Sequence, residues 1–480
     1  MNYRLLLKLN GRLMLIEAAF MILPLIVGII YKEASAISFL PAIAILLIAG
    51  LLLSAIKTKR KELFAREGLA IVSTSWIILS LMGALPFYFS REIPSFIDCF
   101  FETVSGFTTT GASILSDIEA LSNCMLFWRS FTHWAGGMGI LVFMLAISHI
   151  ASGYTMNLMR AESPGPSVEK MTPKIHLTAR ILYLIYTGLT ILQMVLLCIG
   201  GMPVFDSIVN ALATAGTGGF AIKNIGIAYY DSYYLQGVIT VFMILFGVNF
   251  SIYNMLIFRK TRQILKNEEI YWYFGIIITA IILITINILP MSKSPYDAFH
   301  HSAFQVASII STTGFSTCDF NLWPQFSKTI LVLLMLIGAS AGSTGGGIKV
   351  SRIVIMLKFV AKEIKHLIHP RSVNTLKLDG NKVSDETIKK IFLYIICYAG
   401  LLCISTIILS LDGQSFTTNT TAVISALSNI GPGLDAVGPV QNYGFFSPLS
   451  KLVLSINMLF GRLEILPMLV LFAPDTWRKR

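Results

Sequence analysis

The sequence predicts an all-α polytopic membrane protein of ten transmembrane helices: an N-terminal helix pair, then four pseudo-equivalent helix–pore loop–helix repeats around one central pore. Three observations predict this fold class: an apolar composition, long apolar segments, and a glycine-centred motif that recurs. Of the 480 residues, 55% are hydrophobic and only 13% are charged, about half the charged fraction of ordinary globular proteins. Lipid can cover so much apolar surface, whereas the core of a soluble domain cannot.

Apolar segments long enough to cross a hydrocarbon layer of ~30 Å, which takes about 20 helical residues, occur ten times along the chain. They lie at roughly 13–31, 37–56, 69–89, 125–149, 178–200, 233–257, 271–290, 327–357, 388–410 and 449–472, and the eighth is interrupted. The first two form the helix pair, within residues 1–66. The repeats are expected at 67–155, 156–267, 268–383 and 384–480.

Basic residues predict the orientation of these helices in the membrane. Most of the 37 Lys and Arg residues fall at the two termini and in alternate loops. Such an excess marks the cytoplasmic side. We therefore expect both termini in the cytoplasm, and we interpret the net charge of +12 as a topological signal and not as a sign of nucleic-acid binding.

Four connections on the opposite side contain a short apolar segment that ends in a polar stretch around a glycine. Aligned on that glycine, the matching residues are Thr109, Thr110 and Gly111; Thr217, Gly218 and Gly219; Thr312, Thr313 and Gly314; and Asn429, Ile430 and Gly431. A single match would mean little, because Thr and Gly are common residues. Four matches at equivalent topological positions indicate an internal repeat.

Backbone that is not helical is tolerated at membrane depth only where it is buried in protein or lines water. Four such loops on one axis would direct carbonyl oxygens at a dehydrated cation, and glycine permits the backbone angles that this requires. The half-helices before the loops would start at Asp98, Asp206 and Asp297 as N-caps and turn their negative ends to the ion. These features predict a cation-conducting pore. The simpler explanation, small residues that ease helix packing, would not place one match in every repeat.

Longer motifs resemble the Trk/Ktr/HKT superfamily of potassium transporters, specifically its TrkH-type membrane subunits. They lie at 107–111 (FTTTG), 133–139 (HWAGGMG), 338–349 (GASAGSTGGGIK), 367–371 (LIHPR) and 461–465 (GRLEI). The resemblance covers essentially the whole chain. It implies potassium uptake across the bacterial inner membrane by a homodimer, with a filter made of the twelve aligned residues and a cytoplasmic nucleotide-binding ring of the TrkA type as regulatory partner. It implies no enzymatic activity and no cofactor, with K⁺ as the transported, filter-bound ion.

The aligned residues depart from a uniform pattern in two repeats. Gly218 stands where two other repeats have Thr110 and Thr313, and the fourth repeat has no threonine among its aligned residues. A single short ring also offers fewer dehydrated ion sites than a longer filter. We therefore expect an asymmetric filter with a moderate preference for K⁺ and Rb⁺ over Na⁺.

The eighth apolar segment is interrupted by small residues. They are Gly338, Gly342, Ser343, Thr344, Gly345, Gly346 and Gly347, and Lys349 follows them. Each Gly costs a helix interior on the order of 1 kcal/mol relative to Ala, so the helix should break here. We favour a mobile loop that gates the pore beneath the filter over a kink that serves packing. The motif imitates a phosphate-binding Walker A loop, but Ile348 separates Gly from Lys and Val350 replaces the required Ser or Thr, so we exclude nucleotide binding here.

Arg462 lies inside the last apolar segment, where a buried cation is costly and is functional by default. Glu464 is only two residues away and would not share a helix face with it, so a simple pair is not expected. The resemblance places Arg462 below the filter, beside the gating loop, where its charge would hinder cation passage. A structural arginine that bonds to loop carbonyls is an equally open interpretation.

Other functions have weaker support. A secondary transporter for a small solute also uses repeats and broken helices, but the carboxylates within the spans, Glu17, Glu102 and Glu464, form no relay. A membrane enzyme would need a nucleophile–base pair or a metal site. His300 and His301 are adjacent and diverge by about 100° on a helix, so they are not expected to share a metal.

Cytoplasmic loops offer a docking face for a regulatory partner. The basic loops lie at 57–66, 151–177 and 258–268, and residues 374–385 predict a hairpin or loop around Asp379-Gly380. Attraction to anionic lipid is the alternative use of such loops.

Overall fold

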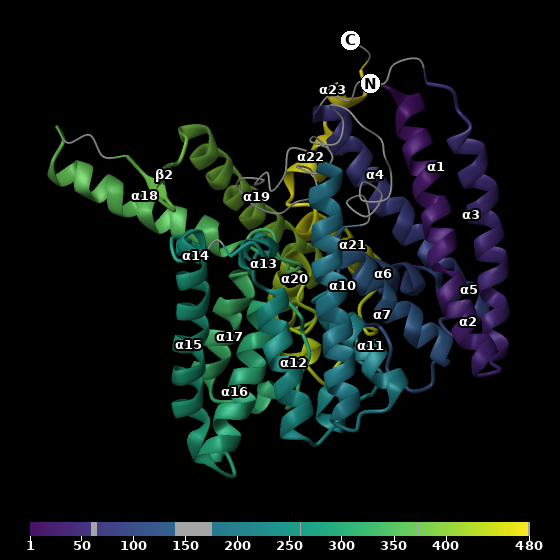
Figure 1. The fold of residues 1–480 in the computed structure, drawn as a ribbon, viewed down its shortest axis with the longest axis horizontal. Helices are drawn as coiled ribbons and strands as arrows, with labels where there is room; N and C mark the ends of the chain where they lie inside the picture. Colours follow the sequence, from purple (N-terminus) through teal and green to yellow (C-terminus); the bar gives the residue numbers. More distant parts are fainter. Residues whose placement is uncertain (59–64, 140–174, 260, 372–374, 479–480) are drawn as a thin grey trace.

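The computed structural model describes residues 1–58, 65–139, 175–259, 261–371 and 375–478. Its regular structure consists of helices and one two-stranded hairpin. Both termini lie at the same end of the molecule, and the long helices run from that end toward the opposite one (Figure 1). The basic loops at 57–66 and 151–177 fall largely outside the described residues.

An N-terminal helix pair forms one flank of the molecule (Figure 1). It consists of α1 (Tyr3–Phe20), α2 (Ile22–Ile30), the short η1 (Ala34–Ser38) and α3 (Phe39–Ser54). Two glycines allow α1 and α3 to approach closely: a β-carbon added at Gly11 would lie 2.6 Å from Cβ of Leu53, and one added at Gly50 would lie 2.8 Å from Leu15. Ile29, Leu52 and their apolar neighbours are exposed, as expected for a surface that faces lipid.

The remaining helices follow the predicted order of long helix, short helix, loop and helix. Residues 65–139 contain α4 (Ala65–Gly83), α5 (Leu85–Ser90), α6 (Phe96–Phe107) and α7 (Asn123–Gly137). Residues 175–264 contain α10 (Ile175–Ile199), α11 (Val204–Ala215), η2 (Gly226–Tyr229), α12 (Tyr233–Phe246), α13 (Phe250–Ile257) and α14 (Thr261–Ile264).

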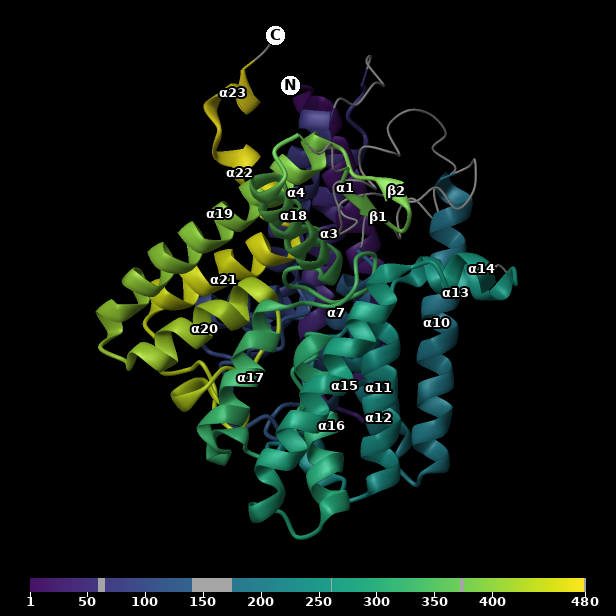
Figure 2. The same ribbon diagram turned by 90° about the vertical axis from the view of Figure 1, so that its left-hand side faces the viewer.

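The second half of the chain repeats this order. Residues 268–382 contain α15 (Glu268–Ile288), η3 (Leu289–Met291), α16 (Pro295–Ile310), η4 (Phe320–Leu322), α17 (Gln325–Leu336), α18 (Val350–Ile368), β1 (Lys377–Leu378) and β2 (Asn381–Lys382). Residues 385–477 contain α19 (Asp385–Leu409), η5 (Ser410–Asp412), α20 (Phe416–Ser428), η6 (Asp435–Val437), α21 (Pro448–Arg462), α22 (Leu466–Phe472) and α23 (Pro474–Trp477). In this last part α19, α20 and α21 lie side by side (Figure 2).

Six helices in the described residues are long and apolar enough to cross a membrane, or seven if α12 and α13 count as one bent span. The other three predicted spans are not counted among these. The described part of the fourth span ends at 139, the eighth is divided between α17 and α18, and the tenth is divided between α21 and α22. The predicted interruption at 338–347 is confirmed, since α17 ends at Leu336 and α18 begins at Val350.

Two predicted spans are not the continuous helices that the sequence suggested. The span at 233–257 bends by 91° between α12 and α13. The carbonyl of Gly247 at this bend accepts a hydrogen bond of 3.0 Å from the amide of Ser340, in the interrupted span. The span at 449–472 breaks at Glu464 and Ile465, which have φ of 59° and 63°. Positive φ at Glu464 and Ile465 ends the helix there. The 91° bend interrupts the other span, so both predictions of continuity are wrong.

The hairpin predicted around Asp379-Gly380 is confirmed. β1 and β2 pair antiparallel, and the two turn residues have φ of 52° and 80°, as a tight two-residue hairpin turn requires. Asp379 accepts a hydrogen bond of 2.6 Å from the amide of Glu268 at the start of α15. Lys358 on α18 donates to the carbonyl of Lys377 at 3.0 Å. The hairpin therefore ties α15 to α18, which projects from the body at the end that carries the termini (Figure 1).

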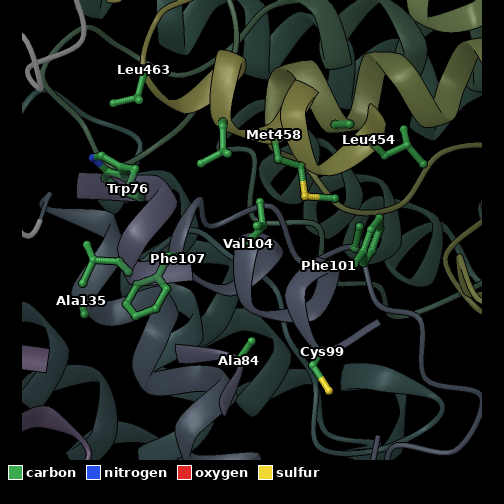
Figure 3. Close-up of a cluster of buried hydrophobic side chains, with 14 of the residues drawn as sticks. Trp76, Ala84, Cys99, Phe101, Val104, Phe107, Ala135, Leu454, Met458 and Leu463 are labelled. Carbon is green, nitrogen blue, oxygen red and sulfur yellow. The ribbon is translucent and has the colours of Figure 1, made fainter. Parts of the chain in front are cut away.

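A large apolar cluster supports α6, the short helix before the first loop of the repeated motif. Figure 3 shows Phe101, Val104 and Phe107 of α6 within this cluster, with Leu454 and Met458 of α21 beside them. All five side chains are at most 1% exposed. Burying side chains of this size contributes about 1.5–3 kcal/mol each, so the position of α6 is fixed on the side that faces α21.

Candidate functional site

The twelve aligned residues share one backbone conformation in all four loops. The first residue of each set, Thr109, Thr217, Thr312 or Asn429, has φ between 53° and 60°. The third residue, Gly111, Gly219, Gly314 or Gly431, has φ between 75° and 105°. A non-glycine residue with positive φ is uncommon, and threonine is costly there. Four occurrences at equivalent positions indicate that the loop conformation itself is needed.

The four loops form a closed ring. Every glycine lies against the carbonyl of the middle residue in the next loop, so that an added β-carbon would strike it. The contacts run from Gly111 to Gly218, from Gly219 to Thr313, from Gly314 to Ile430 and from Gly431 to Thr110. The last contact returns to the first loop. The structure therefore brings all twelve predicted filter residues together around one axis.

Each loop follows the C-terminal end of a short helix: α6, α11, α16 or α20. The N-caps of these helices are Ser95, Pro203, Ser294 and Ser415. The prediction that Asp98, Asp206 and Asp297 are N-caps is therefore wrong, because each helix begins before its aspartate. The three aspartates lie in the first turns, where a negative charge still stabilises the positive end of the helix.

A cavity of about 110 Å³ lies on one face of the ring. All four glycines of the ring line it, together with polar side chains that include Ser113, Asn224, Gln441 and Tyr443. We call this face the cavity side, and the opposite face the loop side. A polar space that opens onto four glycines suits a hydrated cation before it sheds water.

On the cavity side, a buried ion pair holds the segments that leave the ring. Arg129 of α7 lies 2.7 Å from Glu102 of α6, and both side chains are at most 1% exposed. Glu102 also accepts hydrogen bonds from the Ser113 hydroxyl at 3.0 Å and the Ile114 amide at 3.1 Å. Arg129 donates to the carbonyl of Ala221 at 3.2 Å. The pair thus links the first loop to the second.

His133 of α7 joins the same two loops. Its Nε2 accepts a hydrogen bond of 3.2 Å from the amide of Phe220. Its Nδ1 lies 2.7 Å from the carbonyl of Gly106 in α6, so Nδ1 is the nitrogen that donates. His133 and Arg129 therefore both brace the ring.

The glycine-rich segment lies on the loop side of the ring. The amide of Gly346 donates to the hydroxyl of Thr312 at 2.8 Å, and a β-carbon at Gly345 would lie 2.9 Å from the carbonyl of Ser311. Lys349 is 1% exposed and donates to the carbonyls of Gly345 and Gly346. The segment is therefore packed against the ring and held by its own lysine.

Arg462 bonds to three separate parts of the chain. It donates to the carbonyl of Thr344 at 2.7 Å, to the hydroxyl of Thr109 at 3.3 Å, and to the carbonyls of Gly136 and Gly137 at 2.6 Å each. It thus connects the glycine-rich segment, the first loop of the ring and the C-terminal end of α7. Both interpretations of Arg462 agree with this geometry, because the arginine bonds to loop carbonyls and also lies beside the ring.

Three charged residues near the glycine-rich segment have partners that the sequence did not reveal. Glu464 forms an ion pair with Arg352 of α18, in agreement with the expectation that Glu464 does not pair with Arg462. Glu269 of α15 accepts hydrogen bonds from the amides of Ala341 at 2.8 Å and Ser351 at 3.1 Å. For Arg352 and Glu464 the only sequence signal was charge inside an apolar segment, because the partners of all three residues are distant in the chain.

In the fourth loop, Asn429 replaces the first threonine of the aligned sets. Its side-chain amide donates to the Thr110 hydroxyl and to the Met458 carbonyl, both at 2.9 Å. Its carbonyl oxygen Oδ1 has no hydrogen-bond partner within the described residues. Asn429 therefore ties the fourth loop to the first loop and to α21.

The described residues do not support a relay or a metal centre. Glu17 makes no side-chain hydrogen bond there, whereas Glu102 and Glu464 are each tied to an arginine. Over the same ranges, no group of three metal-ligating side chains occurs. His300 contacts Gln236 and His301 contacts Thr317, so the two histidines face different partners.

Comparison with known proteins agrees with this geometry. Residues 36–479 match the family model TrkH, described as "Cation transport protein". Two curated proteins named "Trk system potassium uptake protein TrkH", from Salmonella typhimurium and Escherichia coli, are each 35% identical to this chain over 100% of both chains. The crystal structure of the potassium transporter TrkH from Vibrio parahaemolyticus superposes with a TM-score of 0.90, at 32% identity, and covers 100% of both chains. The chain is therefore a member of the TrkH family of cation transport proteins.

Proposed function

We propose that this chain takes up potassium ions through the ring formed by its four loops. The observation that carries the proposal is the closure of the ring, in which each glycine packs on the next loop's carbonyl and all four glycines border one cavity. The names of the Salmonella and Escherichia relatives, which are potassium uptake proteins, support the choice of ion. K⁺ is the transported ion, and the proposal includes no cofactor and no enzymatic reaction.

In this proposal the ring is the filter. Backbone carbonyls replace the hydration shell of K⁺, and the C-terminal ends of α6, α11, α16 and α20 add negative potential. The chain is divided into an N-terminal pair at 1–66 and four pore repeats at 67–155, 156–267, 268–383 and 384–480. The repeated φ pattern supports this division. A single ring with unequal residues favours moderate selectivity for K⁺ and Rb⁺ over Na⁺.

The glycine-rich segment and Arg462 form the gate of the proposed pore. The bonds from Gly346 to Thr312 and from Arg462 to Thr109 hold this segment and the arginine against the ring. Opening would require these bonds to break and the segment to move. Gly342 and Gly347, with φ of 71° and 67°, provide backbone freedom for such a movement.

The proposal also includes the assembly and location of the protein: a homodimer in the bacterial inner membrane with both termini in the cytoplasm. A cytoplasmic nucleotide-binding ring of the TrkA type would dock on the projecting α18, the hairpin and the basic loops. Support for this surface comes from the contacts that join the hairpin to α15 and α18. Co-purification with a soluble nucleotide-binding protein tests this part, because affinity for anionic lipid alone predicts no such partner.

The alternative is an ion-coupled secondary transporter of a small solute. Such proteins bind substrate near the membrane midplane between repeats and use carboxylates to couple ions. In the described residues the buried carboxylates are engaged by arginines or by backbone amides, or are isolated. This arrangement favours the pore over the alternative.

The decisive experiment measures growth on limiting K⁺ and uptake of Rb⁺ in a bacterium that lacks its own potassium transporters. The intact chain should restore both, while Gly111→Ser and Gly314→Ser should abolish uptake, because each new side chain would strike a carbonyl of the next loop. Gly188→Ser is the matched control, since nothing lies within 4 Å of a β-carbon there. Failure of the intact chain to restore growth, or full uptake by both ring variants, would refute the proposal.

A further inference from the structure

One carbonyl in the ring is held differently from the others. The carbonyl oxygen of Gly431 accepts a hydrogen bond from the Tyr443 hydroxyl at 2.7 Å and a second from the Ser425 hydroxyl at 2.7 Å. The other eleven carbonyls of the ring accept no hydrogen bond from the residues that the structure describes. A carbonyl oxygen has two lone pairs, so the two hydroxyl donors occupy both.

The backbone and burial of Gly431 differ in the same way. Its φ is 105°, whereas Gly111, Gly219 and Gly314 have φ between 75° and 82°. Gly431 is buried, while the other three glycines are partly exposed. The fourth loop is therefore turned further into the protein at its last residue than the other three loops are.

Tyr443 is held firmly in the position from which it donates. Its side chain is 3% exposed, its ring lies 5.8 Å from that of Phe101, and its amide donates to the Ser113 carbonyl at 2.8 Å. Ser113 in turn donates to Glu102, which belongs to the buried ion pair. The Tyr443 hydroxyl is thus supported by the brace on the cavity side.

The matching positions in the other three repeats do not make this contact. The residues four positions before the first ring residue are Ser105, Ala213, Ser308 and Ser425. The Ser308 hydroxyl donates to the carbonyl of Phe315, one residue beyond the ring, at 2.6 Å. The Ser105 hydroxyl has no partner in the described residues, and alanine has no hydroxyl. Among the described residues, only the fourth repeat directs two hydroxyls at a ring carbonyl.

We infer that Tyr443 and Ser425 determine ion specificity by withdrawing the Gly431 carbonyl from the ion path, which leaves three carbonyls in the ring layer nearest the cavity. This inference rests on the proposed function of the ring. Discrimination between K⁺ and Na⁺ depends on the number and field strength of the coordinating carbonyls. A layer with three available carbonyls favours the larger ion less than a layer with four.

The inference is tested in proteoliposomes that contain the full chain, by measuring how strongly K⁺ and Na⁺ compete with Rb⁺ uptake. Tyr443→Phe removes one hydrogen-bond donor and keeps the packing of the aromatic side chain. The double variant Tyr443→Phe/Ser425→Ala leaves the Gly431 carbonyl without either hydroxyl donor. We expect the K⁺ over Na⁺ ratio to rise by about three- to tenfold in the double variant, the range that one net hydrogen bond represents. Each single variant should show a smaller rise.

Tyr273→Phe is the matched control, because Tyr273 is also fully buried and its hydroxyl also donates to a backbone carbonyl, that of Ile244 at 3.2 Å. Its ratio should stay at the wild-type value. An unchanged or lowered ratio in the double variant would overturn the inference. If the Tyr443 variants do not transport, the ratio of the Ser425→Ala single variant decides by the same criterion. Absence of Rb⁺ uptake by the wild-type chain would instead refute the proposed function.

Discussion

On the cavity side of the ring, Arg129 forms a buried ion pair with Glu102, whereas on the loop side Arg462 donates to carbonyl and hydroxyl oxygens. Both arginines bridge segments that are distant in the chain. Arg129 connects the exits of the first and second loops, with side chains that are at most 1% exposed. Arg462 connects the ring, the glycine-rich segment and α7, and it is only partly buried.

This difference in the partners of the two arginines indicates that the two sides of the ring have different roles. Removing one partner of a buried ion pair costs about 3–5 kcal/mol, because the other charge is left without compensation. Such a pair suits a part of the protein that stays fixed. Bonds from an arginine to several neutral oxygens can be exchanged one at a time for water or other carbonyls, so they suit a part that moves. Within the proposed function, the cavity side therefore supports the ring, and the loop side regulates it.

Breaking the support should have the largest effect. Glu102→Ala leaves the Arg129 charge buried, so we expect the free energy of unfolding to fall by about 3–5 kcal/mol and Rb⁺ uptake to be lost. Thermal unfolding in detergent and uptake assays measure the two effects. The control is Glu119→Ala, which removes a pair with Lys223 whose side chains are 25% and 42% exposed and which should change little. Equal stability of the two variants would contradict the assigned role of the buried pair.

Loosening the loop side should change regulation more than stability. Arg462→Ala removes the bonds to Thr344 and Thr109, and one charged hydrogen bond contributes about 1.5–3 kcal/mol. We expect Rb⁺ uptake without the proposed regulatory partner to rise on the order of tenfold. Arg462→Lys, which keeps the charge but cannot reach several acceptors at once, should give an intermediate rate. Unchanged uptake and an unchanged response to nucleotide would remove Arg462 from the gate.

Two threonines at the same position of the ring distinguish the proposed gate from the proposed filter. The Thr312 hydroxyl accepts a hydrogen bond from the amide of Gly346. The Thr217 hydroxyl instead donates to the carbonyl of its neighbour Gly216 at 2.7 Å. Thr312→Val leaves a buried amide without its acceptor, at a cost of about 1–3 kcal/mol, and should raise unregulated Rb⁺ uptake by about fivefold. Thr217→Val should not raise it. A similar rise in both variants would show that the effect comes from the ring and not from the glycine-rich segment.

The sequence predicted the ring better than its supports for a physical reason. The ring requires positive φ at a glycine in every loop, and glycines at equivalent positions are visible in the sequence. The partners of Arg129 and Arg462 come from helices and loops that are distant in the chain, and no local pattern predicts them. No local pattern indicates the bend at Gly247 either, because the Gly247 carbonyl accepts its hydrogen bond from Ser340, which is distant in the chain. The break at Glu464 and Ile465 lacked a signal too, since neither residue is a usual site of positive φ.

The smallest effect is expected at Glu17, a second buried carboxyl group, which differs from Glu102 in having no hydrogen-bond partner among the described residues. The Glu17 side chain is 0% exposed, and both of its oxygens lack hydrogen-bond partners in the described residues. Replacing a desolvated polar group by an apolar group of similar shape is often neutral or stabilising. Glu17→Leu should therefore change the free energy of unfolding by less than about 1 kcal/mol or increase it, and Rb⁺ uptake should be retained. A loss of stability comparable to that of Glu102→Ala would mean that burial of a carboxyl group, and not its ion pair, makes Glu102 essential, and the contrast between the two sides of the ring would then need another basis.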